Sequence, residues 1–195
     1  MSKIVAVVPV RSGSTRVPNK GIIIVTSDGD HILNIARLMG VTTHKRDEYY
    51  ASSQCTGSEF FENLAKSIES EIIVYSPPTS PFISHETIEK SIKLYESQKC
   101  DSVATVFPVK HHMWLDNKPL NYKIEDSPNS QDLPEILRIT YGVCVNSNKN
   151  MIKCKNVVGQ NPFFVKLTEK EAIDIDDMID FKFAEFLKTQ GDTFV

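Results

Sequence analysis

Short apolar stretches recur along this chain, each with the length of a buried strand. The run from Lys3 to Pro9 is almost wholly apolar and rich in β-branched residues, which is typical of a central parallel strand covered on both faces. Residues 22–25 have the same character and predict a second buried strand. Four more strands are predicted over residues 71–75, 102–106, 137–145 and 163–167.

Helical spacing of apolar residues fills several of the intervals between these strands. Asp28 is expected to cap a helix that Gly40 ends, and Thr56 and Glu59 have the spacing of a capping box. Further helices are predicted over residues 84–97 and after Asp176 or Asp177, the last with Ile179, Phe183, Phe186 and Leu187 along one side. Alternation of strands and helices predicts an α/β fold with a mostly parallel sheet, whose ligands bind beyond the carboxyl ends of the strands.

Residues 108–136 interrupt this alternation with polar, proline- and asparagine-rich sequence and scattered aromatic residues. Such a segment is more typical of an inserted arm than of a core. His111 and His112 are adjacent, so on a strand they would face opposite ways and are not expected to form a metal pair. A chain of 195 residues without internal repeats or a linker is expected to form a single domain, residues 1–195, that buries about 70% of its unfolded surface.

Composition excludes several classes of protein. With 41% hydrophobic and 24% charged residues the chain is typical of globular proteins, and its four cysteines form no C-x-x-C pair, which disfavours a zinc or disulfide framework. The apolar run from Ile4 to Val10 is too short to span a membrane or to serve as a secretory signal, so we expect a cytoplasmic protein with no membrane partner. The net charge of −3 gives no indication of a nucleic-acid partner.

The charges are nevertheless unevenly placed. Residues 1–27 contain four cations and no acid, whereas four aspartates gather between Asp174 and Asp180. A basic beginning and an acidic end suggest phosphate and metal binding, although chance clusters of solvated charge would look the same. The basic residues also flank a loop that follows the first strand. There Gly13 lets the backbone approach a phosphate, Ser12 and Ser14 can donate hydrogen bonds, and the cations Arg11, Arg16 and Lys20 can neutralise a triphosphate.

This loop matches neither the Walker A pattern nor the dinucleotide fingerprint. Instead, residues 8–20, Val-Pro-Val-Arg-Ser-Gly-Ser-Thr-Arg-Val-Pro-Asn-Lys, resemble the signature of the CMP-acylneuraminate synthetases and related sugar-acid cytidylyltransferases. Four further motifs follow in the order of that family: Val25-Thr26-Ser27-Asp28, Pro78-Thr79-Ser80-Pro81, Gln131-Asp132-Leu133-Pro134 and Asp174-Ile175-Asp176, with Asp101-Ser102-Val103 opening a strand between the second and third.

The resemblance implies a Rossmann-like domain of the nucleotide-diphospho-sugar transferase type, with helices on both faces of the sheet. It also implies an enzyme that needs Mg²⁺, joins CMP from CTP to an acidic keto sugar such as sialic acid or a related nonulosonic acid, releases pyrophosphate, and forms a homodimer through the inserted arm. Carried over residue by residue, it implies catalytic roles for Arg11 and Lys20, sugar contacts from Gln131 and Asp132, and metal binding by Asp174 and Asp176. The implied nucleotide-binding residues are Arg11, Ser12, Gly13, Ser14, Arg16, Asn19, Lys20, Ser27, Thr79 and Ser80.

Spacing supports the metal assignment, because alternate residues of an extended segment point to the same side, here with Ile175 on the other. Mg²⁺ prefers one or two carboxylates together with phosphate oxygens and water. The alternative for Asp176 is that it caps the last helix, and the two roles are compatible. Glu59 is better explained by the capping box than by catalysis.

The chain departs from the family in three places. Lys20 is followed directly by the second strand, where the family has a long helix; a parallel crossover normally contains one, and its loss is expected to uncover one side of the sheet. Pro77 and Ile83 stand where the family usually has Gln and Arg, and Asn129-Ser130 replaces a common Arg pair. These differences keep open a degenerate, non-catalytic homologue that binds nucleotide or a partner subunit, and an enzyme of this class that uses another nucleotide.

Overall fold

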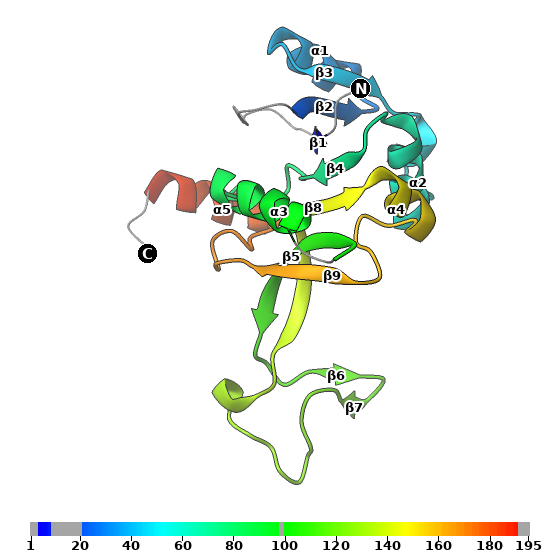
Figure 1. Ribbon diagram of the computed structural model, residues 1–195. Coiled ribbons are helices and arrows are strands. Elements are labelled where there is room, and N and C mark those ends of the chain that lie inside the picture. The colour runs from blue at the N-terminus through cyan, green and yellow to red at the C-terminus, as the bar shows by residue number, and fades with distance from the viewer. Residues whose placement is uncertain (1–3, 9–20, 98–99, 191–195) are drawn as a thin grey trace.

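Seven strands form one sheet at the centre of the molecule, in the order β3-β2-β1-β4-β8-β5-β9 (Figure 1). The computed structural model describes residues 4–8, 21–97 and 100–190. All neighbours are parallel except β8, which is antiparallel to both β4 and β5, so the prediction of a mostly parallel sheet is confirmed. The strands are β1 (Ile4–Val8), β2 (Gly21–Ser27), β3 (Thr42–Lys45), β4 (Ile72–Tyr75), β5 (Ser102–Val109), β8 (Ile136–Ser147) and β9 (Pro162–Lys166).

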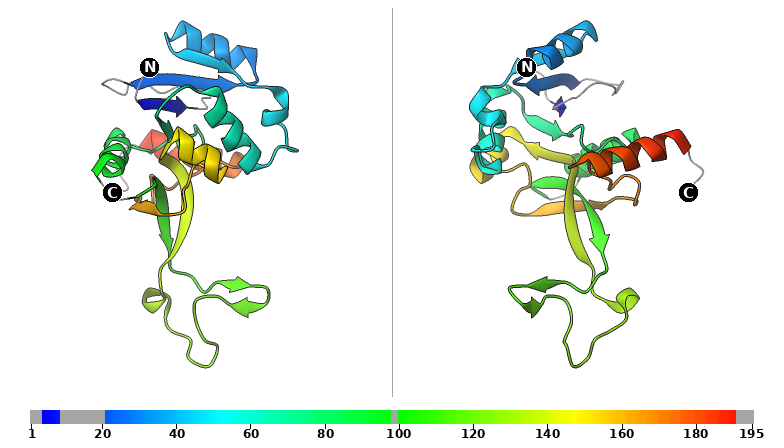
Figure 2. Two further views of the ribbon diagram at one scale, coloured as in Figure 1. Left: turned by 45° about the vertical axis from the view of Figure 1, so that its right-hand side comes forward. Right: turned by 180° about the vertical axis from the view of Figure 1, so that it is seen from behind.

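Helices cover both faces of the sheet, as the sequence predicts (Figures 1 and 2). The bounds are α1 (Asp30–Leu38), α2 (Gly57–Ser67), α3 (His85–Ser97), α4 (Asn148–Cys154) and α5 (Met178–Gln190), with a short helical turn η1 (Glu48–Ala51) before α2. Helices α2 and α4 pack with the sheet residues Val5, Val7 and Ile73. Alternate residues point to the other face, where Ala6 and Val74 pack with α3.

The first two strands are paired in parallel without a described helix between them. Their register runs from Ile4 opposite Gly21 to Val8 opposite Val25, and the joining residues 9–20 lie outside the described residues. Ala6 and its cross-strand neighbour Ile23 lie on the face of the sheet that α1 and α3 cover. They lie between those two helices, and both are only half-buried. The described part of the chain thus leaves this strip of the sheet less covered than the strands around it.

Two helix starts show how local sequence sets the boundaries. Thr56 Oγ1 accepts from the Glu59 amide at 3.2 Å, and Glu59 Oε2 accepts from the Thr56 amide at 2.8 Å, which confirms the capping box. The prediction that Asp28 caps α1 is wrong. The N-cap is Gly29, which has no side chain to accept a capping hydrogen bond, and the Asp28 carboxylate lies 3.7 Å from the Arg46 guanidinium.

An arm projects from the sheet where β5 and β8 continue beyond their neighbours (Figures 1 and 2). It carries the two-stranded ribbon of β6 (Trp114–Leu115) and β7 (Lys118–Pro119), followed by the turn η2 (Ser130–Asp132). Edge-on packing of His112 against Tyr122, with ring centroids 4.7 Å apart, stabilises it from within. Its large exposed apolar residues are Trp114, Leu115, Leu120 and Ile124.

Helix α5 projects from the body of the molecule toward the C-terminus (Figure 2). The side predicted to be apolar is open, since Ile179 is 77% and Phe183 51% exposed, whereas the buried residue is Ala184, which does not belong to the predicted set. Among the described residues, no helix combines the length and hydropathy that crossing a membrane would require.

Candidate functional site

The carboxyl ends of β2, β3 and β4 lie at one edge of the sheet, and the segment before α5 is fastened to that edge. The Arg46 amide, which follows β3, donates to the Ser27 carbonyl at the end of β2 (2.9 Å). The Ile175 amide donates to the Thr79 carbonyl, after β4, at 2.8 Å. The structure therefore brings the Asp174-Ile175-Asp176 motif against the Pro-Thr-Ser-Pro motif, although 95 positions separate Thr79 from Asp174 in the sequence.

The predicted phosphate loop begins at the same edge. Strand β1 is parallel to both β2 and β4, so its carboxyl end points the same way as theirs. The predicted residues that follow it lie outside the described residues: Arg11, Ser12, Gly13, Ser14, Arg16, Asn19 and Lys20. Two other predicted nucleotide contacts are described and buried. Ser27 is 4% exposed and its Oγ accepts from the Gly29 amide (3.1 Å), while Ser80 is 7% exposed in the turn after β4.

Arg46 is a cation of this edge that the sequence analysis did not single out. Its side chain is 17% exposed and lies over the Phe60 ring, with the guanidinium carbon 5.3 Å from the ring centroid. Its Nε is buried and has no hydrogen-bond partner among the described residues. Besides Asp28 at 3.7 Å, the guanidinium therefore keeps hydrogen-bonding capacity for a further acceptor. The sequence signal was a basic residue directly after a strand, in a stretch whose strand character was not recognised.

Tyr75 ends β4 in the middle of this edge. Burial, with smaller contributions from Cys144, Asp174 and Tyr141, raises the pKa of its phenol to about 12, so the group is neutral at physiological pH. Arg46 acts in the opposite direction on the same phenol. Tyr75 also packs edge-on against Phe60, the ring that carries the Arg46 guanidinium, with ring centroids 6.5 Å apart.

Asp174 and Asp176 occupy different environments. Asp174 is half-buried, and its Oδ1 is shielded from solvent without a hydrogen-bond partner among the described residues. A buried carboxylate oxygen without a donor is costly unless a cation satisfies it. Asp176 is exposed, and it is Asp177 that caps α5, because Asp177 Oδ1 accepts from the amides of Ile179 (2.7 Å) and Asp180 (3.0 Å). Asp176 is therefore not needed as the cap.

Glu171 fixes the turn that leads to these aspartates. Its Oε1 accepts from Thr87 Oγ1 (2.6 Å) and Ser84 Oγ (2.8 Å) at the start of α3, and its Oε2 accepts from Thr168 Oγ1 (3.2 Å). Burial alone would raise the pKa of Glu171, but the hydrogen bonds from Thr87 and Ser84 outweigh it and hold the pKa below its usual value. The ionised carboxylate thus ties the Asp174 segment to α3.

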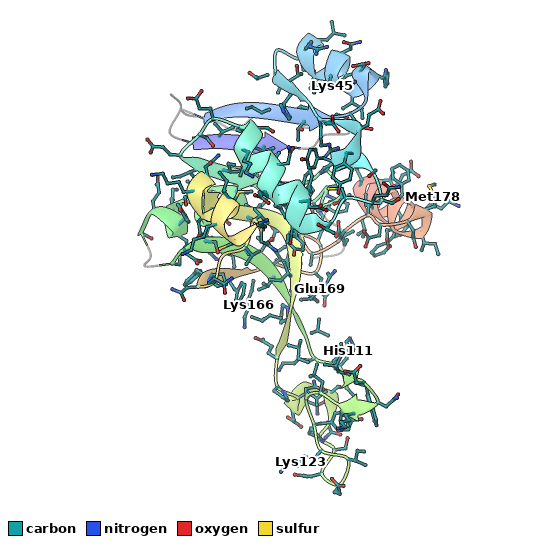
Figure 3. All side chains as sticks on the ribbon, turned by 90° about the vertical axis from the view of Figure 1, so that its right-hand side faces the viewer. Lys45, His111, Lys123, Lys166, Glu169 and Met178 are labelled. Atoms are coloured by element: carbon teal, nitrogen blue, oxygen red, sulfur yellow. The ribbon has the colours of Figure 1, made fainter. Side chains whose placement is uncertain are left out.

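The two predicted sugar contacts lie apart from this edge. Gln131 and Asp132 are exposed in η2, on the arm, where the Gln131 carbonyl accepts from Lys110 Nζ at 3.1 Å. Figure 3 shows the arm through His111 and Lys123, which lie well away from Lys45 at the end of β3 and Met178 at the start of α5. Within one copy of the chain, the structure does not bring Gln131 and Asp132 to Asp174. Among the described residues, no group of three or more His, Cys, Asp or Glu side chains could hold a metal on its own.

Known proteins resemble the chain in sequence and in fold. No protein-family model matches it. An N-acylneuraminate cytidylyltransferase from Escherichia coli O18:K1:H7 is 23% identical over 226 positions, covering 94% of this chain and 51% of the relative, so the chain spans about half of that protein. The post-translational flagellin modification protein B of Campylobacter coli is 21% identical over 224 positions, covering 96% and 95%. Both alignments are longer than this chain, so the relatives have residues without a counterpart here.

Solved structures agree on the fold. The 4-diphosphocytidyl-2C-methyl-D-erythritol synthase of Anaerococcus prevotii superposes with a TM-score of 0.67 at 15% identity, covering 97% of this chain and 99% of the other. A CMP:2-keto-3-deoxy-manno-octonic acid synthetase complexed with CTP gives 0.62 at 13% identity, with the same coverage. The chain has the nucleotide-diphospho-sugar transferase type of fold that the sequence predicts.

Replacing Glu171 by Gln is expected to lower the free energy of unfolding by about 1 kcal/mol at pH 7, since partly solvated charged hydrogen bonds are lost. Because the folded pKa lies below the unfolded one, this stabilisation is complete above the usual value of 4.5 and disappears as the pH falls through the folded pKa. Urea unfolding at pH 7 and pH 3 measures it, with the exposed Glu169→Gln as a nearly silent control. An equal loss at both pH values would contradict the prediction.

Proposed function

We propose that the chain is a CTP-dependent nucleotidyltransferase that transfers CMP to an acidic keto sugar and releases pyrophosphate. The observation that carries the proposal is the Asp174 carboxylate, whose buried oxygen has no hydrogen-bond partner among the described residues and lies at the edge where the cationic loop after β1 begins. The relatives and solved structures support it, because their printed names include cytidylyltransferases acting on acylneuraminate and on 2-keto-3-deoxy-manno-octonic acid.

In this reaction a sugar hydroxyl attacks the α-phosphorus of CTP. A new bond forms between the sugar oxygen and phosphorus, the hydroxyl proton is released, and pyrophosphate departs with the electron pair of the broken P–O bond. Negative charge builds on the departing oxygen, so fixed cations at the β- and γ-phosphates stabilise the transition state. Arg11, Arg16 and Lys20 would supply that charge from the loop, with Ser12, Ser14 and the Gly13 backbone donating hydrogen bonds.

The described edge adds a cation to this set. Arg46 is held over Phe60, and its buried Nε has no hydrogen-bond partner in the described part of the chain, so its guanidinium would be available to a nucleotide oxygen. Thr79 and Ser80 follow β4 and would line the other side of the nucleotide. A rigid, largely desolvated guanidinium interacts more strongly with phosphate than a solvated side chain does.

Mg²⁺ fits the two aspartates of the motif. Asp174 Oδ1, which has no donor among the described residues, would provide one ligand position. Asp176 would provide another, because Asp177 and not Asp176 caps α5. Two carboxylates completed by phosphate oxygens and water match the preferences of Mg²⁺, and no all-protein cage is needed. When bound, the ion would neutralise phosphate charge and orient the nucleotide. The chain's own contribution is to hold Asp174 at the edge through the Ile175–Thr79 bond.

The arm is proposed to complete the site of a second copy. Gln131 and Asp132 are exposed in η2, on the arm, which projects away from the sheet (Figure 1). Exposed Trp114 (53%) and Leu115 (60%) give the arm apolar surface that a partner subunit can cover. In a two-fold homodimer each arm would reach the partner's edge, and the two sites would be equivalent.

A non-catalytic homologue that binds nucleotide or a partner subunit is the second candidate. It is favoured by the half-buried strip at Ala6 and Ile23, over which the described residues supply no crossover helix, and by Pro77 and Ile83 in place of polar family residues. Calorimetry separates the two, because CTP binding without pyrophosphate release from any acceptor supports the non-catalytic protein. Competition of CTP against ATP, GTP and UTP in a thermal-shift assay identifies the nucleotide.

Incubation with CTP, Mg²⁺ and a panel of acidic keto sugars is expected to release pyrophosphate. Arg11→Glu should lower kcat/KM by about 10³-fold or more, because it replaces a stabilising cation by a repelling anion. Arg37→Glu, the same reversal at an exposed position of α1, should stay within about twofold of the natural chain. No pyrophosphate from any acceptor in the panel would contradict the proposal.

Asp174→Asn is expected to weaken Mn²⁺ binding in the presence of CTP by about tenfold or more, since a charged ligand becomes a neutral one. Electron paramagnetic resonance of free Mn²⁺ measures this without requiring turnover. Asp177→Asn is the matched control, because Asn caps a helix as well as Asp does and metal affinity should not change. Unchanged Mn²⁺ affinity in Asp174→Asn would remove Asp174 from the metal site.

Arm exchange is tested by mixing two impaired chains. Arg11→Glu and Asp132→Ala should each be weakly active alone, while a refolded equimolar mixture should recover about a quarter of normal activity. Half of randomly paired dimers are mixed, and one of their two sites then combines an intact Arg11 with the partner's intact arm. No recovery, with mixed dimers verified by mass, would show that Asp132 does not serve the partner's site.

A further inference from the structure

Tyr141 adopts a backbone conformation that its side chain disfavours. Its φ of 55° lies in the left-handed region, although it stands within strand β8 and not in a turn. Bulky residues rarely occupy that region, which glycine adopts at little cost. Strain of this kind persists only where the surrounding structure enforces it, and it concentrates at functional sites.

The structure around Tyr141 is built to enforce it. The pairing of β5 with β8 shifts register between Ala104 and Val106, which is a β-bulge. Two buried threonines replace the interrupted ladder: Thr140 Oγ1 donates to the Thr105 carbonyl (3.0 Å), and the Val143 amide donates to Thr105 Oγ1 (3.0 Å). The bulge therefore turns the chain at Tyr141 without leaving those polar groups unsatisfied.

Gly142 locks the other side of the bulge. A Cβ at this position would lie 2.7 Å from Ile83 Cδ1, so a larger residue would require the Ile83 side chain to move. Its carbonyl accepts from Ser76 Oγ at 2.9 Å, which fastens the bulge to the residue directly after β4. The strained residue is thereby placed at the carboxyl edge that carries the candidate site.

The Tyr141 ring has one supported side and one open side. It stacks on Phe61 of α2, with ring centroids 6.2 Å apart and planes 25° apart, and Phe61 in turn packs edge-on against Tyr75. Tyr141 is nevertheless 37% exposed. A half-exposed aromatic ring on a rigid aromatic support is suited to contact the apolar face of a ligand.

We propose that Tyr141 is a specificity-determining residue whose open face stacks against the acceptor sugar. The inference rests on the proposed function. The strand order favours the acceptor, and not the nucleotide, as the molecule that Tyr141 contacts. The cationic groups, which are the β1 loop and Arg46, belong to the β3-β2-β1 side of β4, whereas Tyr141 lies on β8, on the other side of β4. The Asp174 segment is fastened to Thr79, after β4, the strand that separates these two sides.

Steady-state kinetics of Tyr141→Gly test the proposal, with N-acetylneuraminate as the first probe and 2-keto-3-deoxy-manno-octonate as the second. Glycine suits the left-handed backbone and removes the ring. We expect the KM for the acceptor to rise about tenfold or more, as for loss of an apolar pocket contact, while the KM for CTP stays within about twofold. The melting temperature should change by only a few degrees, because relief of strain offsets the lost contact with Phe61.

Tyr141→Phe is the matched control, since it keeps the ring and should leave both KM values within about threefold of normal. A purely structural role for Tyr141 would instead raise both KM values together or lower the melting temperature sharply, and either result overturns the proposal. So does an unchanged acceptor KM in Tyr141→Gly. If the natural chain turns over neither probe, the proposed function fails for these acceptors and the inference fails with it, whereas turnover by the natural chain with an unchanged acceptor KM in Tyr141→Gly overturns the inference alone.

Discussion

One backbone hydrogen bond, from the Ile175 amide to the Thr79 carbonyl, joins the two halves of the candidate site. Without it, the aspartate motif would belong only to the segment that leads into α5, a helix with little buried surface. The bond is made possible by Glu171, which ties the preceding turn to the start of α3 through Ser84 and Thr87. A side chain that binds a metal ion gives a higher affinity when it is already held in place, because binding free energy spent on ordering a loop is lost from the affinity. The position of Asp174 therefore depends on the hydrogen bonds of Glu171 with Ser84 and Thr87, and none of these three residues is a proposed substrate contact.

The sequence predicted the α/β architecture and most of the elements, because buried parallel strands and amphipathic helices have strong periodic signals. Boundaries agreed to within a few residues, as for the predicted strand 102–106 inside β5 (Ser102–Val109). Elements with weak signals were missed. Strand β3 (Thr42–Lys45) has the polar sequence Thr-Thr-His-Lys at the edge of the sheet, and α4 (Asn148–Cys154) is only seven residues long. The antiparallel direction of β8 was not foreseen either, because Val143, Cys144 and Val145 are all buried and give this strand the continuous apolar pattern that is typical of parallel strands.

The residues of the candidate site likewise fall into those that the sequence predicted and those that it did not. Motifs with characteristic residues, such as Pro-Thr-Ser-Pro and Asp-Ile-Asp, could be found in the sequence, and the structure places them together. Arg46 was missed because its importance comes from its tertiary packing over Phe60. Tyr141 was missed because the sequence Thr-Tyr-Gly does not indicate a left-handed backbone at the tyrosine. The β1 loop with its Arg and Lys residues, and the metal itself, remain predictions from the sequence.

The half-buried strip at Ala6 and Ile23 and the open side of α5 have a common physical meaning. Both are apolar surfaces that the described residues leave open, and the longer alignments with the relatives show that this chain has fewer residues than they do. The bulge at Tyr141 and the Glu171 network lie on other elements, the first on β8 beside β4 and α2, the second at the start of α3. In the proposed site, the ring offered to the acceptor is therefore held by elements other than the first two strands. A shortened connection after β1 would then alter how the nucleotide is held while leaving that ring in place.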